Sequence, residues 1–440
     1  MNSVSLLSSL QSSGSRLLNS MQGITIARRL ISARYTLAVG AQALVSGFHF
    51  LLNIVLVRQI SQYDYGTFAF AFVLAMFAQA INNALISTPL TVYTPVIKDG
   101  DARAQQEKML SFVNLIFCIG LMIVGLMYVP FSALDSSTVI CISLFVAVYA
   151  ARQYSRSFGY ARLRPLVTAA GDTTYMLAGI TIMAILLTVN PEPSVGYILL
   201  ALAGANLIAI LVENILLHGR AALDQIKGSW NGYGHIWEQS RWALAGAVTT
   251  LLMGQAHSLI IVKSQGPEAF APLAAGAVLF GPVRVALMTW QNMVKPEMAM
   301  ALSEDRFQEV RGQMKRTTVL MAIVMACVVA ALAIFWPWIY GFLYEKRYAS
   351  EPMAMIVALW AAITLCSASY TPMSAALQAL NNFRALAMGS IYASGVAAAT
   401  VTALLYFHSP EATLVGILMA ELFLAVFMLR VVVQSMRGKS

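Results

Sequence analysis

Twelve apolar stretches, each long enough to cross a lipid bilayer, follow one another along this sequence. A transmembrane helix needs about 20 mostly apolar residues, and a soluble core has no room for so many runs of that length. Only 11% of the residues are charged, against about 25% in an ordinary soluble domain, so a soluble globular fold is excluded. The stretches lie at 36–57, 66–97, 110–131, 138–158, 166–188, 194–217, 242–262, 270–294, 317–343, 352–378, 385–407 and 411–433. We therefore predict an all-α integral membrane protein with about twelve transmembrane helices.

The basic residues between these stretches predict how the chain is oriented. If the N-terminus is cytoplasmic, the lysines and arginines that fall on the opposite side are Arg58, Lys263, Lys346 and Arg347, and nearly all the others lie on the cytoplasmic side. Cytoplasmic loops of membrane proteins carry an excess of lysine and arginine. The pattern therefore predicts an even number of spans with both termini in the cytoplasm. The net charge of +9 then reflects topology, and we expect no nucleic-acid partner.

A weak internal repeat divides the chain into halves. Arg34 and the residues after it recur around Arg241, and with a shift of 220 positions Arg164 meets Arg384. Six spans repeated after six predict two six-helix bundles, at 36–218 and 242–433, related by a pseudo-two-fold axis along the membrane normal. Substrate sites of transporters often lie at the interface of such repeats.

Three shorter segments fall outside the predicted bundles. We expect 1–35 to be a cytoplasmic amphipathic segment, 219–241 a cytoplasmic linker and 434–440 a cytoplasmic tail. The first segment is rich in serine and lacks the apolar run and small-residue cleavage site of a secretory signal. We interpret it as a retained part of the protein with the character of an interfacial helix.

Polar side chains recur on single faces of four predicted spans. In the first span Gln42, Ser46, His49 and Asn53 follow at steps of four, three and four, which places all of them on one helical face. Further stripes comprise Gln79 and Asn82 in the second span, Thr250 and His257 in the seventh, and Ser367, Tyr370, Thr371, Ser374 and Gln378 in the tenth. Interhelical hydrogen bonds would explain any single stripe. Four together favour a water-filled cavity, because polar groups inside a bilayer face protein, water or a ligand.

One basic residue, Arg284, lies well inside a predicted span, and Gln291 and Lys295 continue its face. An unpaired arginine at that depth costs at least about 2.5 to 3.5 kcal/mol on insertion scales. Two roles remain open for it. The first is an ion pair with a buried glutamate such as Glu421, and the second is contact with an anion, since the guanidinium fork matches phosphate oxygens.

A second basic strip lies near the cytoplasmic end of the fourth span. Its members Tyr149, Arg152, Gln153, Arg156 and Tyr160 share one face. The bias of arginine toward the cytoplasmic side explains such a strip as well as a binding role does. Both readings remain open.

Acidic residues and cysteines give weaker signals. Asp172, Glu213 and Glu421 are each candidates for a coupling proton or sodium ion, although the place of Glu213 near a span end also suits a solvated side chain. The four cysteines lie inside apolar stretches without paired spacing, so we interpret them as core residues and not as disulfide partners or zinc ligands. Without a GxxxxGK[ST] or GxGxxG run, the sequence predicts no nucleotide-driven transport, no cofactor and no metal site.

Three local motifs carry a resemblance to a known family. A turn after the first span reads Arg58-Gln59-Ile60-Ser61-Gln62-Tyr63-Asp64-Tyr65-Gly66, the fourth span ends in Tyr160-Ala161-Arg162, and the tenth is followed by Ala379-Leu380-Asn381-Asn382-Phe383-Arg384. With these motifs the chain, from about residue 30 to 435, resembles bacterial polysaccharide flippases of the Wzx type, which serve O-antigen and exopolysaccharide synthesis. They belong to the multidrug/oligosaccharidyl-lipid/polysaccharide exporter superfamily. The chain departs from many members in having twelve predicted spans in place of fourteen.

The resemblance implies a transporter of the bacterial inner membrane and not an enzyme. Such a protein moves an undecaprenyl-diphosphate-linked oligosaccharide to the outer leaflet through a cationic cavity between two six-helix bundles. Its partners would be membrane lipids, the lipid-linked oligosaccharide, a glycan polymerase and an export complex. The predicted substrate-binding residues are Arg284, Arg152, Arg156, Gln42, His49, Asn53, Gln79, Asn82 and Gln291.

Three rival functions stay open, one of which is a scaffold for a glycan assembly complex that transports nothing itself. A cation-coupled multidrug exporter would use the same fold, but it would favour a site rich in carboxylates and aromatic residues, and the single deep basic residue argues against it. A membrane glycan polymerase or ligase would place its catalytic residues on large extracytoplasmic loops, whereas the loops on that side have about ten residues or fewer, which is the length of plain connections.

Overall fold

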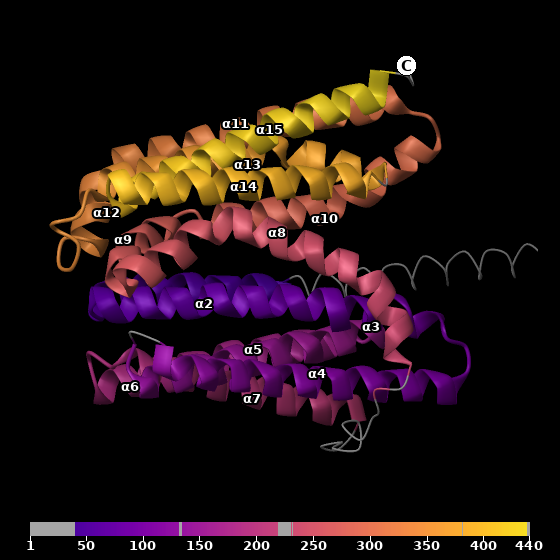
Figure 1. Cartoon of the computed structure of the whole chain (residues 1–440), viewed down its shortest axis with the longest axis horizontal. Helices are drawn as coiled ribbons and strands as arrows, with labels where there is room; N and C mark the ends of the chain where they lie inside the picture. Colours follow the sequence, from indigo (N-terminus) through magenta and orange to yellow (C-terminus); the bar gives the residue numbers. More distant parts are fainter. Residues whose placement is uncertain (1–39, 132–133, 219–229, 231, 381, 438–440) are drawn as a thin grey trace, which may run out of the picture.

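The computed structural model describes residues 40–131, 134–218, 230, 232–380 and 382–437, and all regular elements within them are helices (Figure 1). The predicted amphipathic segment 1–35, most of the linker 219–241 and the last residues of the tail 434–440 lie outside the described residues. The all-α membrane fold predicted from the apolar stretches is confirmed.

In the described residues, eleven helices are long and apolar enough to cross a membrane, and one bent helix pair makes a twelfth. The first half contains the first span Gly40–Gln59, α2 (Gln62–Asn82), α3 (Thr88–Val92), α4 (Gly100–Tyr128), α5 (Ser136–Ala161), α6 (Pro165–Val189) and α7 (Val195–His218). The second half contains α8 (Tyr233–Gln265), α9 (Pro267–Val278), α10 (Gly281–Ser303), α11 (Phe307–Ile334), α12 (Trp336–Leu343), α13 (Met353–Ala379), α14 (Phe383–Phe407) and α15 (Thr413–Arg437). The count of twelve spans is confirmed when the bent pair is taken as one.

The helix that contains the seventh span begins before the span that was predicted. Helix α8 starts at Tyr233, inside the predicted linker, whereas its membrane-compatible part starts at Ala243, next to the predicted start at 242. The apolar pattern locates only the part of a helix that crosses the hydrocarbon, and α8 extends ten residues beyond that part, from Tyr233 to Trp242.

Two helices are broken where prolines occur. The bend between α9 and α10 measures 60°, and Pro282 lies in the first turn after it. The second span continues from α2 into α3 through a π-helical turn, Asn83–Ser87, just before Pro89. Proline removes a backbone donor and clashes with the preceding turn, so breaks of this kind are expected beside it.

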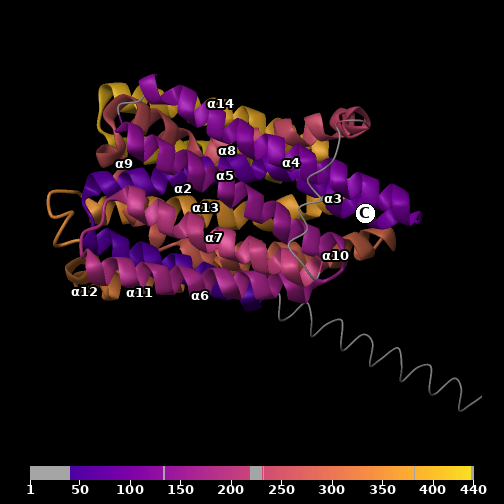
Figure 2. The ribbon, with the colours of Figure 1, turned by 90° about the horizontal axis from the view of Figure 1, so that it is seen from below.

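The helices form two lobes, one from the first span to α7 and the other from α8 to α15 (Figure 1). In the first lobe α5 packs on α2, α4 and α7, and α6 packs on α7; in the second, α14 packs on α8 and α15, and α13 packs on α10, α11 and α15. The long helices run in roughly the same direction, as the perpendicular view also shows (Figure 2). The lobes touch mainly where α2 lies against α8 and α9.

The outer faces of the helices are apolar and exposed, which is the condition of a chain immersed in lipid. In α11 only 11% of the membrane-length window is buried by protein. Cys327 belongs to this exposed face, so its interpretation as a core residue is wrong. Cys366 is buried, and Cys118 and Cys141 are partly buried. Apolarity alone does not separate a core face from a lipid face, because the bilayer is as apolar as the core.

One glycine fixes how closely the lobes approach each other. A Cβ atom on Gly66 of α2 would lie 1.9 Å from the carbonyl oxygen of Pro267 at the start of α9. The clashing atom belongs to the backbone of Pro267, so no flexible side chain could move aside to make room for a Cβ. The contact therefore requires glycine at the end of the Arg58 to Gly66 turn.

We expect Gly66→Ala to destabilise the protein by about 1–3 kcal/mol or more, since 1–3 kcal/mol is the usual cost of overpacking. The measurement is the unfolding midpoint of the purified protein in detergent. Gly204→Ala is the matched control, since a Cβ there meets no atom within 4 Å. Equal midpoints for the two variants would contradict the close approach of α2 and α9.

Candidate functional site

A cavity of about 730 Å³ lies between the two lobes and is lined by residues from both. Its walls are the first span, α2, α5, α8, α9 and α10, with one residue from α13. Seven of the nine predicted site residues line it: Gln42, His49, Asn53, Gln79, Arg152, Arg156 and Arg284. Most of the lining is apolar, so these polar side chains are isolated groups on a hydrocarbon surface.

The polar stripe of the first span faces this cavity along its whole length. Gln42, Ser46, His49 and Asn53 all line it. Asn53 accepts a hydrogen bond of 3.0 Å from the Tyr65 hydroxyl of α2. The four-three-four spacing predicted a common face, and the structure directs that face inward.

Two arginines of α5 share one aspartate of α6. Arg152 Nη2 lies 2.6 Å from Asp172 Oδ1, and Arg156 Nε lies 2.9 Å from the same oxygen. Asp172 is 0% exposed and Arg152 2% exposed, so the ion pairs are almost free of solvent. Arg156 also donates hydrogen bonds to Gln153 and to Gln42 of the first span. This network holds two guanidinium groups at the cavity wall with a single carboxylate directly bonded to them.

Glu213 of α7 lies beside this cluster. Its side chain is 0% exposed, so the solvated position that sequence suggested is wrong. A Cβ on Gly171 would meet Glu213 Oε1 at 1.9 Å, which shows how tightly the carboxyl packs on α6. Gly171 directly precedes Asp172 in α6, so the Glu213 carboxyl lies close to the ion-paired cluster.

In the second lobe Arg284 follows the bend between α9 and α10. Its guanidinium carbon lies 4.9 Å from the centre of the Trp360 ring of α13, a cation–π arrangement. Glu421 of α15 is a buried carboxylate of the same lobe, 7% exposed. Within the described residues no carboxylate lies within ion-pair distance of Arg284. The direct Arg284–Glu421 ion pair, one of the two roles left open by the sequence, is therefore absent from this conformation.

The two lobes thus present similar arrangements on opposite walls. In the first, Arg152 lies 4.1 Å from the centre of the Tyr175 ring, and Tyr175 also contacts His49 at 3.2 Å. In the second, Arg284 lies over Trp360, which packs against His257. Sequence reasoning missed both aromatic partners. The spacing of Asp172 and Tyr175, three residues apart on one helix, was the signal that could have identified the first.

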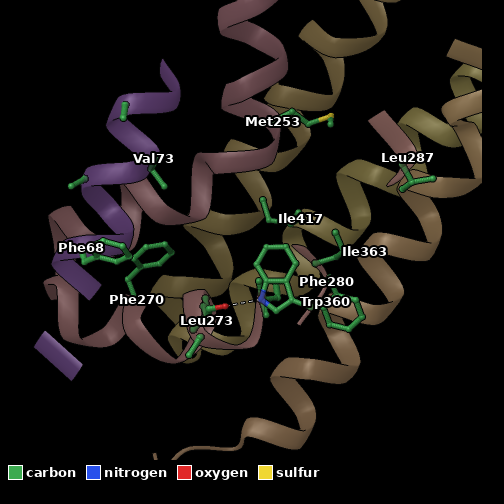
Figure 3. Close-up of a cluster of buried hydrophobic side chains, with 14 of the residues drawn as sticks. Phe68, Val73, Met253, Phe270, Leu273, Phe280, Leu287, Trp360, Ile363 and Ile417 are labelled. Atoms are coloured by element: carbon green, nitrogen blue, oxygen red, sulfur yellow. Dashed lines mark hydrogen bonds between the residues drawn. The ribbon is translucent and has the colours of Figure 1, made fainter. Parts of the chain in front are cut away.

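Buried aromatic and aliphatic side chains from both lobes pack together beside the cavity (Figure 3). Phe68 of α2 and Phe270 of α9 face each other there, 1% and 3% exposed, and both line the cavity. Trp360 is held by its indole nitrogen, which donates a 2.8 Å hydrogen bond to the Leu273 carbonyl.

Two predicted site residues lie elsewhere. Asn82 is 0% exposed, donates a 2.7 Å hydrogen bond to Asn114 of α4 and accepts one from Ser87. Gln291 lies on α10, half-buried and outside the cavity lining. The stripe of the tenth span also lies outside the lining, and the Gln378 side chain donates a hydrogen bond to Ser374. For Asn82 the structure shows the interhelical alternative, whereas the bond between Gln378 and Ser374 lies within α13.

The turn that carries the family resemblance joins the two lobes at the end of the first span. Ser61 caps α2 by accepting from the Asp64 amide, and Asp64 in turn accepts from the Val195 amide at the start of α7. Arg347, after α12, donates to the Gln59 carbonyl at 2.9 Å and pairs with Glu192 at 2.5 Å. Gln62 also donates to the Arg347 carbonyl. One arginine of the second lobe thus contacts two connections of the first.

The chain is similar to one curated protein and to several solved structures. No family model matches it. The "EPS I polysaccharide export inner membrane protein EpsE" of Ralstonia nicotianae is 22% identical over 395 residues, covering 84% of this chain and 86% of that protein. Among solved structures, an inward-facing multidrug resistance MATE family transporter of the MOP superfamily matches with a TM-score of 0.72 at 12% identity, over 93% of this chain and 99% of the other. The lipid II flippase MurJ in an inward closed conformation matches with a TM-score of 0.67 at 12% identity, over 90% and 87%.

These matches show that the chain is a multi-pass membrane protein with the two-lobed fold that the MATE family transporter and MurJ share. The resemblance to bacterial polysaccharide exporters, based on three short motifs, is confirmed by the curated relative and the shared fold. By name, the matched proteins are a polysaccharide export protein, a transporter and a flippase.

We expect Asp172→Asn to destabilise the protein by about 3–5 kcal/mol, because it leaves two buried arginines without their bonded carboxylate. The unfolding midpoint in detergent measures this. The double variant Asp172→Asn with Arg152→Gln should recover part of the loss, and Asp101→Asn, an exposed carboxylate, should be nearly neutral. A fully stable single variant would show that the ion pairs do not hold α5 and α6 together.

Proposed function

We propose that this protein translocates a polyprenyl-diphosphate-linked oligosaccharide across the bacterial cytoplasmic membrane for surface polysaccharide synthesis. The observation that carries the proposal is that arginines from both lobes, Arg152, Arg156 and Arg284, line one cavity. A diphosphate that links a polyprenol to a sugar is a compact dianion, and the guanidinium group binds such oxygens through paired hydrogen bonds.

The charge balance of the cavity favours an anion. Three guanidinium groups face it, while Asp172 is the carboxylate directly bonded to two of them. Arg284 faces the cavity with an aromatic ring at its side. A phosphate group that entered would provide the ion pair that Arg284 does not have in this conformation, and charge-assisted hydrogen bonds of this kind are among the strongest in proteins.

The rest of the lining suits the sugar part of the substrate. Gln42, Asn53 and Gln79 offer amide donors and acceptors for hydroxyl groups, and Phe72 and Met76 provide apolar surface for sugar rings. In this proposal the polyprenyl chain stays in the bilayer while the polar head occupies the cavity. The relatives support this class of substrate, since one is named for polysaccharide export and one for flipping lipid II.

Transport would proceed by alternating access, with both termini on the cytoplasmic side as the basic residues predict. The aromatic layer around Phe68 and Phe270 and the Arg347 contacts then close the extracytoplasmic end. Opening that end requires these contacts to break while the lobes rotate about α2, α8 and α9. A glycan polymerase and an export complex remain the partners that the proposal implies.

A cation-coupled multidrug exporter is the alternative, and the MATE fold match favours it. Carboxylates do lie in both lobes, at Asp172, Glu213 and Glu421. They sit behind the arginines and do not line the cavity, which argues against a site for cationic drugs. Efflux of cationic dyes from a strain without its own pumps separates the two functions: the proposal expects none.

We expect Arg284→Ala to abolish polysaccharide export in cells, because the phosphate loses its partner on the second lobe. Arg284→Lys should retain part of the activity, since lysine keeps the positive charge but lacks the two parallel donors of the guanidinium group. Surface polysaccharide is measured in a strain that depends on this gene, at matched levels of membrane protein. Normal export by the alanine variant would refute the role of Arg284.

We also expect Arg347→Ala to favour opening of the extracytoplasmic end, since it removes bonds to Gln59 and Glu192. The probe is Ala69→Cys on the cavity wall, in a chain whose native cysteines are replaced by alanine. A membrane-impermeant maleimide added to intact cells should label this cysteine several-fold faster in the Arg347→Ala background. Glu345→Ala, which changes a neighbouring carboxylate, serves as control. Unchanged labelling would mean that Arg347 does not hold that end closed.

A further inference from the structure

A second, smaller hollow lies where α4 begins and α5 turns into α6. Its volume is about 300 Å³, and it is lined by Gly100, Arg103, Ala104, Glu107, Arg162 and Arg164. It shares no lining residue with the central cavity. We propose that this basic pocket binds the phosphate of an anionic lipid head group at the membrane surface, a site separate from that of the transported substrate.

The buried carboxylate of Glu107 holds the arginines of the pocket in place. Glu107 is 2% exposed, and Arg162 grips it with two hydrogen bonds, Nη2 to Oε2 at 2.5 Å and Nε to Oε1 at 3.3 Å. Arg103 reaches Glu107 Oε1 at 3.4 Å and the Ala161 carbonyl at 3.5 Å. Because both carboxylate oxygens are engaged by guanidinium groups, Glu107 orients the arginines and does not present a bare negative charge to the pocket.

The pocket keeps an excess of positive charge. Three arginines surround one carboxylate, which leaves two positive charges uncompensated by the lining. Arg164 is exposed, and no ion pair to it occurs within the described residues. A phosphate ester, with one or two negative charges, matches this excess. Basic pockets between transmembrane helices at the cytoplasmic surface bind anionic head groups in other membrane proteins.

The turn between Arg162 and Arg164 supplies an independent observation. The Leu163 amide donates a hydrogen bond to the Tyr160 carbonyl, and the Arg164 amide donates one to the Gly159 carbonyl, both at 2.9 Å. This pattern is a Schellman motif, in which the left-handed position is normally glycine. Here the position is Leu163, with φ of 56° and 69% of its surface exposed. A non-glycine residue in this conformation costs about 1–2 kcal/mol.

The position of Leu163 at the edge of the membrane explains why an exposed leucine occupies this strained conformation. The helices on both sides, α5 and α6, are candidate spans, so residues 162–164 lie at the bilayer boundary. An apolar side chain between two arginines suits this boundary: the leucine enters the acyl-chain region while the guanidinium groups meet phosphates. Backbone strain at an exposed residue is a pointer to function when the surroundings do not explain it.

The second lobe provides a built-in control. The internal repeat aligns Arg164 with Arg384 at the start of α14, and Arg384 is likewise exposed. The position two residues before it is Asn382, where the first lobe has Arg162. The basic pocket thus belongs to the first lobe alone. Arg384→Gln removes an equivalent charge from the second lobe and leaves the lining of the pocket unchanged.

The experiment uses the purified full-length protein in a neutral detergent. Its unfolding midpoint is followed while dioleoylphosphatidylglycerol or, in parallel, dioleoylphosphatidylcholine is added. Phosphatidylglycerol should raise the midpoint above the level reached with phosphatidylcholine. Arg164→Gln should weaken this response on the order of fivefold in lipid concentration, as expected for one arginine near an anionic surface, and Arg384→Gln should leave it unchanged.

Two further arms identify the ligand. Inorganic phosphate alone should leave the midpoint unchanged; an Arg164-dependent rise with phosphate would overturn the lipid assignment in favour of a soluble phosphate ester. Leu163→Gly should keep or raise the lipid-free midpoint while weakening the phosphatidylglycerol response. Equal lipid responses of wild type and Arg164→Gln would refute the site outright.

Discussion

The cost of placing arginine inside a bilayer is the constraint on which this structure depends. Each buried guanidinium must find a counter-charge, a hydrogen-bond acceptor or an aromatic face, or it expels the helix from the membrane. The first lobe meets this need with Asp172, which bonds both Arg152 and Arg156. The second lobe meets it with the ring of Trp360. The first arrangement is rigid, and the second leaves Arg284 free to take a new partner.

That difference gives the two lobes different parts in the proposed transport. The ion-paired cluster joins α5 and α6 with the first span through Gln42, so the first wall of the cavity is a fixed frame. Arg284 lies a few residues after a 60° bend, where a helix can change direction without losing many hydrogen bonds. A substrate phosphate that bridges the walls would couple the fixed lobe to the bent helix. This coupling links binding to the movement of the lobes.

The sequence predicted most of the fold and the larger part of the cavity, for a reason that is physical. In a bilayer every polar side chain carries a cost, so the spacing of Gln42, His49 and Asn53 revealed an inward face directly. Asn82 obeys the same rule but satisfies it by bonding Asn114 on a neighbouring helix, and sequence does not say which polar face meets a helix and which meets a cavity. The contacts of Arg347 were not predictable either, because they join residues nearly 290 positions apart.

The central claim is that a diphosphate is held between arginines of the two lobes, and direct binding tests it best. The purified protein is titrated with a short-chain polyprenyl diphosphate and with the matched uncharged polyprenol, at several salt concentrations. The account predicts that the diphosphate binds at least tenfold more tightly, that salt weakens this preference, and that Arg284→Ala removes most of it. Equal affinity for the charged and uncharged lipids would contradict the account.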